Sequence, residues 1–122
     1  RDFCLSRGLG DVYKRQLCDE EKVDIIFTTG GTGFSPRDCT PEAAMAVAHR
    51  NVPGIAEAMR AASAKVTPRA MLSRAVCVIR KKTLIVNLPG SPKAVKENLE
   101  AVLPVLEHGL DILTDQAGEC GR

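Results

Sequence analysis

Short apolar runs rich in β-branched residues recur along the chain and predict strands at residues 23–27, 75–79 and 83–88. The first run is β-branched and aromatic and is bounded by glycine, which predicts a largely buried strand. Residues 80–82 alone separate the other two runs, and so short a link favours a hairpin. At least one strand is therefore expected to run antiparallel to the others.

Two helices are predicted between the first strand and the second. Thr40 is the expected N-cap of the first helix, which begins at Pro41 and runs to about Arg50. An alanine-rich second helix begins at Pro53, and residues 65–74 then form a loop with a short turn.

A long third helix is predicted after the last strand, with Ser91 as its N-cap and Pro92 at its first position. Pro104 lies within it and is expected to kink it or split it in two. The apolar residues share one helical face, which is more typical of packing on a sheet than of a partner-binding surface. They are Val95, Leu99, Val102, Leu103, Leu106, Leu110 and Leu113.

A glycine-rich loop, Thr-Thr-Gly-Gly-Thr-Gly at residues 28–33, follows the first strand. Its glycines allow positive φ and a close approach of a ligand to the backbone, and its threonines add hydroxyl donors. Successive N–H groups in such a turn bind anions, and ligands of open α/β sheets lie past the carboxyl ends of strands. The loop has neither the P-loop lysine nor the G-x-G-x-x-G pattern. It therefore predicts a phosphate-bearing ligand, with a plain glycine turn as the alternative.

Pro89-Gly90-Ser91 follows the last strand and precedes the third helix. A helix N-terminus placed just past a strand end is a second candidate anion site. An ordinary helix cap is the alternative interpretation, and both can hold together.

Three motifs occur in order: TTGGTGFSPRDCTPEAA at residues 28–44, Met71-Leu72-Ser73-Arg74, and NLPGSP at residues 87–92. Together, and at this spacing, they resemble the molybdopterin adenylyltransferase family. That family includes bacterial molybdenum-cofactor enzymes, a domain of plant cofactor synthesis and the N-terminal domain of gephyrin. The resemblance extends from about Leu17 to the C-terminus.

The resemblance implies an adenylyl transfer in molybdenum cofactor biosynthesis. Mg-ATP would activate the terminal phosphate of molybdopterin, giving adenylyl-molybdopterin and pyrophosphate, with Mg²⁺ as cofactor and ATP and molybdopterin as substrates. It also implies a three-layer α/β domain with an open, mostly parallel sheet, usually assembled as a homotrimer.

Asp38 matches the family's functional aspartate after the glycine loop. A phosphate monoester is already largely dianionic at neutral pH, so Asp38 is better cast as a Mg²⁺ ligand or positioner than as a general base. The alternative roles are helix capping or pairing with Arg37. Ser73 and Arg74 match a motif near the pterin site, although Arg74 alone would be interpreted as a solvated charge. The residues expected to bind molybdopterin or nucleotide phosphates are Thr29, Gly30, Gly31, Thr32, Gly33, Ser73, Pro89, Gly90 and Ser91.

The chain departs from the family at Cys39, where relatives usually carry valine, and at Lys81, where they usually carry glycine. Residues 1–16 resemble no part of the family, which begins with a strand and a serine-aspartate turn. The domain is therefore expected at residues 17–122, lacking the family's first strand, behind an unrelated or artefactual head. A genuine divergent N-terminus is the alternative.

Two other functions share this fold. One is a non-catalytic molybdopterin-binding or scaffold module, which would bind the pterin without ATP-dependent turnover. The other is a related domain of competence-damage-type proteins or fused molybdotransferases, which belongs to longer chains.

Charge, hydrophobicity and cysteine content further limit the class of protein. The net charge of +2 comes from residues 1–16, and residues 17–122 carry thirteen basic and thirteen acidic side chains, so no nucleic-acid surface is predicted. No apolar stretch is long enough to span a membrane and no signal peptide appears, which favours the cytoplasm. The five cysteines form no C-x-x-C pair, so reduced thiols are expected rather than a zinc site.

Overall fold

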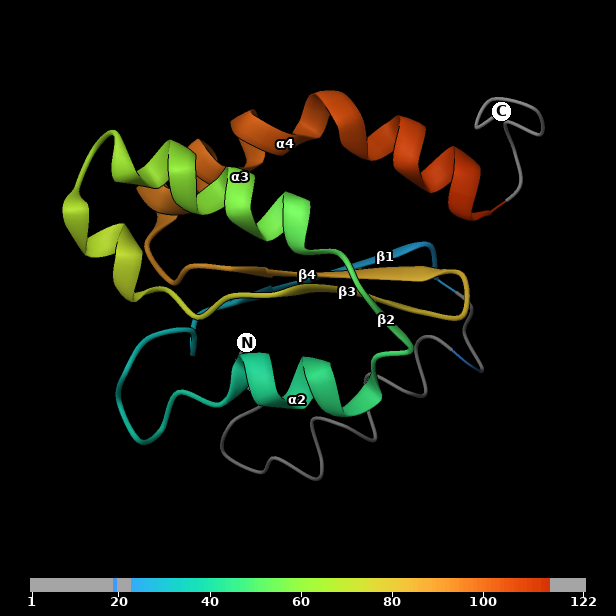
Figure 1. The fold of residues 1–122 in the computed structure, drawn as a ribbon, viewed down its shortest axis with the longest axis horizontal. Helices are drawn as coiled ribbons and strands as arrows, with labels where there is room; N and C mark the ends of the chain where they lie inside the picture. The colour runs from blue at the N-terminus through green and yellow to red at the C-terminus, as the bar shows by residue number, and fades with distance from the viewer. Residues whose placement is uncertain (1–18, 20–22, 115–122) are drawn as a thin grey trace.

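The computed structural model describes Asp19 and residues 23–114, so the predicted head at residues 1–16 lies outside the described residues. Helices α3 and α4 cover one face of a central sheet and α2 covers the other (Figure 1). The predicted three-layer α/β class is confirmed. The strands are β1 (Ile25–Thr29), β2 (Arg50–Asn51), β3 (Cys77–Arg80) and β4 (Thr83–Leu88), and the helices are α2 (Thr40–Val47), α3 (Pro53–Ala64), the 3₁₀ helix η1 (Pro68–Leu72) and α4 (Pro92–Leu113).

The described sheet has four strands in the order β1-β4-β3-β2. β1 pairs with β4 in parallel, whereas β3 is antiparallel to both β4 and β2. Three of these four strands therefore point the same way and β3 runs against them. The β3–β4 hairpin confirms the predicted antiparallel pair, and β4 has its predicted bounds.

The core lies on both faces of β4, whose six residues are all buried. Leu84, Val86 and Leu88 alternate toward a cluster shared with α3 and α4, whereas Ile85 points toward α2. This alternation is the period-2 pattern of a strand covered on both sides. The buried Asn87 amide donates to the Thr28 hydroxyl at 2.9 Å, and its oxygen accepts from the Val76 N–H at 3.2 Å.

β1 corrects the expectation of a largely buried strand. Its residues are mostly half-buried or exposed, and the Phe27 side chain is 42% exposed. Among the described strands, β1 has a neighbour on one side only, so sheet pairing and helix cover protect it incompletely. An apolar sequence indicates that a strand can be buried. How much of the strand is buried depends on its position in the sheet.

The first helix begins and ends earlier than predicted. Its N-cap is Cys39 rather than Thr40, with no side-chain capping hydrogen bond, and it ends at Val47 rather than near Arg50. After the helix the chain continues into the short strand β2. Just before this strand, the His49 N–H donates to the Ile79 carbonyl at 2.8 Å. β2 was not predicted because two exposed residues carry no hydrophobic pattern.

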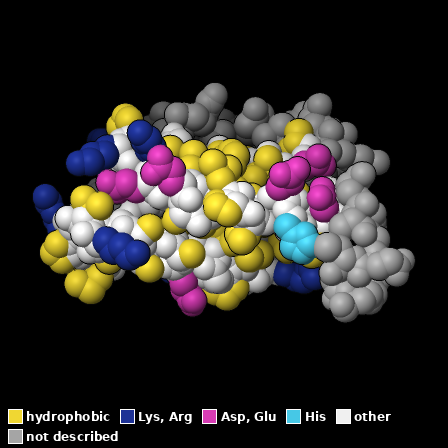
Figure 2. Space-filling view, turned by 90° about the horizontal axis from the view of Figure 1, so that it is seen from above, with side chains coloured by type: hydrophobic (Ala, Val, Ile, Leu, Met, Phe, Trp, Pro, Cys, Tyr) yellow, Lys and Arg dark blue, Asp and Glu magenta, His cyan; other side chains and the backbone are white. Residues whose placement is uncertain are grey.

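α4 confirms the predicted N-terminus, with Ser91 as N-cap and Pro92 in the first turn. Pro104 does not split it, and α4 is a single helix of 22 residues. Most of the predicted apolar stripe packs on the sheet and α3, but Leu103 is 53% exposed. Figure 2 shows the outer side of the layer that α3 and α4 form, where charged side chains of both signs lie among hydrophobic ones.

Cys39 and Cys77 are the cysteines within the described residues. Cys77 is free and fully buried, and burial raises the pKa of its thiol to about 12, so it acts as the small hydrophobe that the sequence predicts. Cys39 forms a disulfide, so the expectation of reduced thiols is wrong for this residue.

Candidate functional site

The glycine loop and the 89–91 turn lie against each other at one edge of the sheet. They follow β1 and β4, which are parallel neighbours, so both carboxyl ends reach the same edge. The Gly30 N–H donates to the Leu88 carbonyl at 2.9 Å, and a Cβ built on Gly90 would lie 3.5 Å from the Gly30 Cα. The structure thus brings the two predicted anion-binding segments together.

Two structural constraints explain the three glycines of the loop. Gly30 and Gly31 have φ of 80° and 71°, in the left-handed region that disfavours side chains. Gly33 faces another constraint, because a Cβ there would lie 2.9 Å from Asp38 Oδ2. The loop therefore holds its backbone close to both the second turn and the Asp38 carboxylate.

The Asp38 side chain closes the turn that follows the glycine loop. Its Oδ2 accepts from the Ser35 N–H at 3.1 Å, while its own N–H donates to the Ser35 carbonyl at 2.8 Å. It does not cap α2, whose N-cap is Cys39. Within the described part of the chain, no group of three or more His, Cys, Asp or Glu residues is placed to hold a metal ion. One carboxylate still suits Mg²⁺, which commonly takes its other ligands from water and substrate phosphates.

The Arg74 guanidinium connects the glycine loop to the rest of the domain through hydrogen bonds and an ion pair. Its Nε donates to the Gly33 carbonyl at 2.7 Å, one terminal nitrogen donates to the Asp38 carbonyl at 2.5 Å, and the other pairs with the Glu42 carboxylate. Its backbone N–H also donates to the Thr32 carbonyl at 2.8 Å. Arg74 is therefore not the solvated charge that its sequence position alone suggests.

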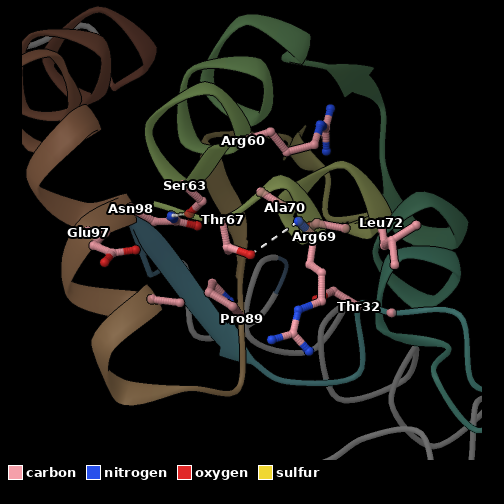
Figure 3. Close-up of a pocket in the computed structure, with 13 residues that line it drawn as sticks. Thr32, Arg60, Ser63, Thr67, Arg69, Ala70, Leu72, Pro89, Glu97 and Asn98 are labelled. Carbon is pink, nitrogen blue, oxygen red and sulfur yellow. Dashed lines mark hydrogen bonds between the residues drawn. The ribbon is translucent and has the colours of Figure 1, made fainter. Parts of the chain in front are cut away.

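A cavity of about 270 Å³ opens beside the glycine loop. α3, η1 and α4 form its other walls, and Figure 3 shows polar side chains from all three pointing into it. Of the predicted ligand residues, the cavity is lined by Thr32, Gly33, Ser73 and Pro89.

The remaining predicted residues lie at the loop and turn, outside the cavity lining: Thr29, Gly30, Gly31, Asp38, Gly90 and Ser91. Ser91 is an ordinary helix cap here, since its hydroxyl accepts from the Ala94 N–H at 3.5 Å. Because the Ser91 hydroxyl caps the helix, the turn can bind an anion only through its backbone N–H groups and the N-terminal end of α4.

Sequence reasoning missed several polar residues of the cavity wall: Arg60, Ser63, Thr67, Arg69, Glu97 and Asn98. They lie on helices or the η1 turn and belong to no glycine-rich or charged motif. The Thr67 cap is the one local signal, because a threonine before a proline is typical of a helix start. Its hydroxyl accepts from the Arg69 N–H at 3.3 Å.

The fold and this edge define an α/β domain with paired glycine turns at the carboxyl ends of parallel strands. A family described as "Probable molybdopterin binding domain" matches residues 10–108, and the chain belongs to this family.

Curated relatives and solved structures agree with that assignment. The chain is 48% identical over 98 residues to a Helicobacter pylori (strain J99) protein named molybdopterin adenylyltransferase, covering 80% of this chain and 56% of the relative. It is 50% identical over 99 residues to the protein of that name from Escherichia coli K12, covering 78% and 51%. The chain thus spans about half the length of these relatives. A molybdopterin biosynthesis enzyme of Thermus thermophilus superposes with a TM-score of 0.84 at 50% identity, covering 90% of this chain and 69% of that one.

Proposed function

We propose that this chain adenylylates molybdopterin in molybdenum cofactor biosynthesis, using ATP and Mg²⁺. The observation that carries the proposal is the contact between the glycine loop and the 89–91 turn at the ends of β1 and β4. Two adjacent sets of backbone N–H groups suit a reaction between two phosphate-bearing molecules. The relatives named molybdopterin adenylyltransferase, about half identical over the matched region, support the choice of substrate.

The reaction demands positioning more than proton transfer. An oxygen of the molybdopterin phosphate attacks the α-phosphate of ATP, a new P–O bond forms, and the bond to the β-phosphate breaks to release pyrophosphate. The attacking monoester is already largely dianionic at neutral pH, so no strong base is required. The protein must hold two anions in line and offset their repulsion.

The chain's own groups divide these tasks. Backbone N–H groups of residues 31–33 would bind phosphate oxygens, and the N-terminal end of α4 would face the second anion. Asp38 would hold Mg²⁺, which supplies positive charge to the transferring phosphate when bound. Ser73, which lines the cavity, would contact the pterin-bearing substrate.

A direct assay tests the proposal. Purified protein is incubated with molybdopterin, MgCl₂ and ATP labelled at the α-phosphate, and adenylyl-molybdopterin and pyrophosphate are measured. We expect equal amounts of the two products, with none after EDTA or when a phosphate-free pterin replaces molybdopterin. If molybdopterin binds but the label stays in ATP, the non-catalytic binding module replaces this proposal.

We also propose that the active form is a cytoplasmic homotrimer, as the family resemblance implies. Exposed apolar side chains near the ligand edge, Phe34, Met71 and Leu72, supply surface for a subunit contact. Among the described helices, none has the length and apolar character required to cross a lipid bilayer. Sedimentation equilibrium and cell fractionation would check the trimer and the location.

A further inference from the structure

The cavity beside the glycine loop carries opposite charges on opposite walls. Arg69, on η1, extends along the wall near Thr32 and Pro89, whereas Glu97 lies on α4 beside Asn98 (Figure 3). Thr67 lies between them. A ligand in this cavity therefore meets a cation at the glycine-loop end and an anion at the α4 end.

Arg69 is the arginine of this region whose guanidinium is available to a ligand. Arg60 donates to the Ala75 carbonyl at 2.7 Å, and Arg74 is bound to the loop and to Glu42. Within residues 23–114, the hydrogen bond at Arg69 is that of its backbone N–H to Thr67, which fixes the turn and leaves the side chain exposed. A guanidinium beside phosphate-binding N–H groups is the usual partner for a phosphate.

Glu97 offers the complementary chemistry at the α4 end. Its side chain is half-buried, and no protein hydrogen bond or ion pair engages its carboxylate among the described residues. The neighbouring Asn98 amide is already committed, donating to the Ser63 hydroxyl at 2.5 Å and the Met59 carbonyl at 3.4 Å. Glu97 therefore provides the acceptor for N–H donors of a ligand.

We propose that Arg69 and Glu97 fix the direction in which molybdopterin lies in the cavity. Arg69 binds the phosphate-bearing end, and Glu97 accepts hydrogen bonds from the amino and ring N–H donors of the pterin's pyrimidinone edge. The opposite direction would set a phosphate dianion against a carboxylate, which costs electrostatic energy. The inference rests on the proposed function and adds two binding residues to its site.

The size of the cavity agrees with this occupant. Pockets for drug-sized ligands measure roughly 300–1,000 Å³. At about 270 Å³, the cavity suits one small ring system rather than pterin and nucleotide together. The nucleotide is then left to the parts of the glycine loop and of the 89–91 turn that lie outside the cavity lining.

Calorimetric titration of the whole chain with three probes tests the proposal: molybdopterin, 6-hydroxymethylpterin, which has no phosphate, and inorganic phosphate. Arg69→Gln should weaken molybdopterin and phosphate binding roughly ten- to hundredfold, because a charge-assisted hydrogen bond is lost. It should leave 6-hydroxymethylpterin unchanged. Glu97→Gln should weaken both pterins by roughly tenfold and leave phosphate binding intact.

Matched variants separate these effects from general damage. Arg50→Gln and Glu100→Gln remove exposed charges of the same types outside the cavity and should change nothing. Arg69→Lys and Glu97→Asp keep the charges and should recover much of the affinity, and circular dichroism checks that each variant is folded.

The two hypotheses fail differently. If wild-type protein binds molybdopterin and neither Arg69→Gln nor Glu97→Gln changes its affinity, the orientation is wrong and the proposed function stands. Equal weakening of all three probes by Arg69→Gln would also overturn the orientation. Absence of molybdopterin binding to folded wild-type protein would overturn both.

Discussion

Arg74 connects parts of the site that are far apart in the sequence. A single guanidinium reaches two carbonyls of the glycine-loop region and the Glu42 carboxylate at the start of α2. The loop backbone bends through two positive-φ glycines and is therefore costly to order. Arg74 offsets part of that cost by donating hydrogen bonds to two backbone carbonyls of this region.

Replacing this arginine should loosen the loop. We expect Arg74→Gln to lower the free energy of unfolding by about 1–3 kcal/mol, because several charge-assisted hydrogen bonds are lost. Urea denaturation measures the change. Arg37→Gln, an exposed arginine on the same loop, is the control and should shift stability by less than about 0.5 kcal/mol. Equal effects of the two variants would show that Arg74 does not fix the loop.

Gly33 should be required for the position of Asp38 rather than for stability. A Cβ at residue 33 would lie 2.9 Å from Asp38 Oδ2, and a flexible carboxylate can move away at little energetic cost. Gly33→Ala should therefore reduce the adenylylation kcat at least roughly tenfold through misplacement of the carboxylate. The thermal midpoint should change little. Gly54→Ala, where a Cβ meets nothing within 4 Å, should keep full activity. Unchanged turnover in Gly33→Ala would remove Asp38 from the reaction.

At the scale of elements, the sequence predicted the features that depend on neighbouring residues along the chain. The apolar run at residues 83–88 predicted β4, and serine followed by proline predicted the start of α4. The glycine loop and the 89–91 turn were predicted because glycine permits backbone conformations that other residues avoid and proline fixes φ. β2 and the cavity walls could not be predicted in this way. Arg69 and Glu97 carry no pattern of their own, and they line one cavity because η1 and α4 both pack against α3.

The β3–β4 hairpin contains a residue in a strained conformation. Lys81 has φ of 53°, in the left-handed region that disfavours residues with a side chain. The Lys81 ammonium pairs with the Asp19 carboxylate at 3.5 Å, and such a solvent-accessible ion pair contributes little to stability. Lys81→Gly should therefore raise the free energy of unfolding by about 0.5–1 kcal/mol. Lys82→Gly, one residue along with an ordinary φ, should lower it. Thermal or urea denaturation compares the pair, and stabilisation by both or neither would contradict this account.

Ligand binding should change the hydrogen exchange of the glycine loop and of the 89–91 turn. We expect molybdopterin together with ATP to protect the amides of residues 31–33, 90 and 91 from hydrogen exchange, because N–H groups of these two segments would bind phosphate. The hairpin at residues 80–83, at the opposite edge of the sheet, is the internal control. Protection confined to that edge would show that the site is elsewhere.

At the scale of the whole molecule, one edge of the sheet carries the proposed site and the layers around it hold that edge in place. α2 anchors the glycine loop through Glu42, while α3, η1 and α4 close the cavity over it. The chain spans about half the length of its curated relatives, so its own turnover must be measured rather than inherited from them.

The most direct test compares wild-type protein with Asp38→Asn, measuring molybdopterin affinity and adenylyl-molybdopterin formation in the same preparations. Asp38→Asn keeps the shape of the side chain and removes the charge that would hold Mg²⁺. We predict that turnover falls at least roughly a hundredfold while molybdopterin affinity stays within about threefold, because the charge acts mainly in the transition state. Turnover equal to that of wild type would contradict the account.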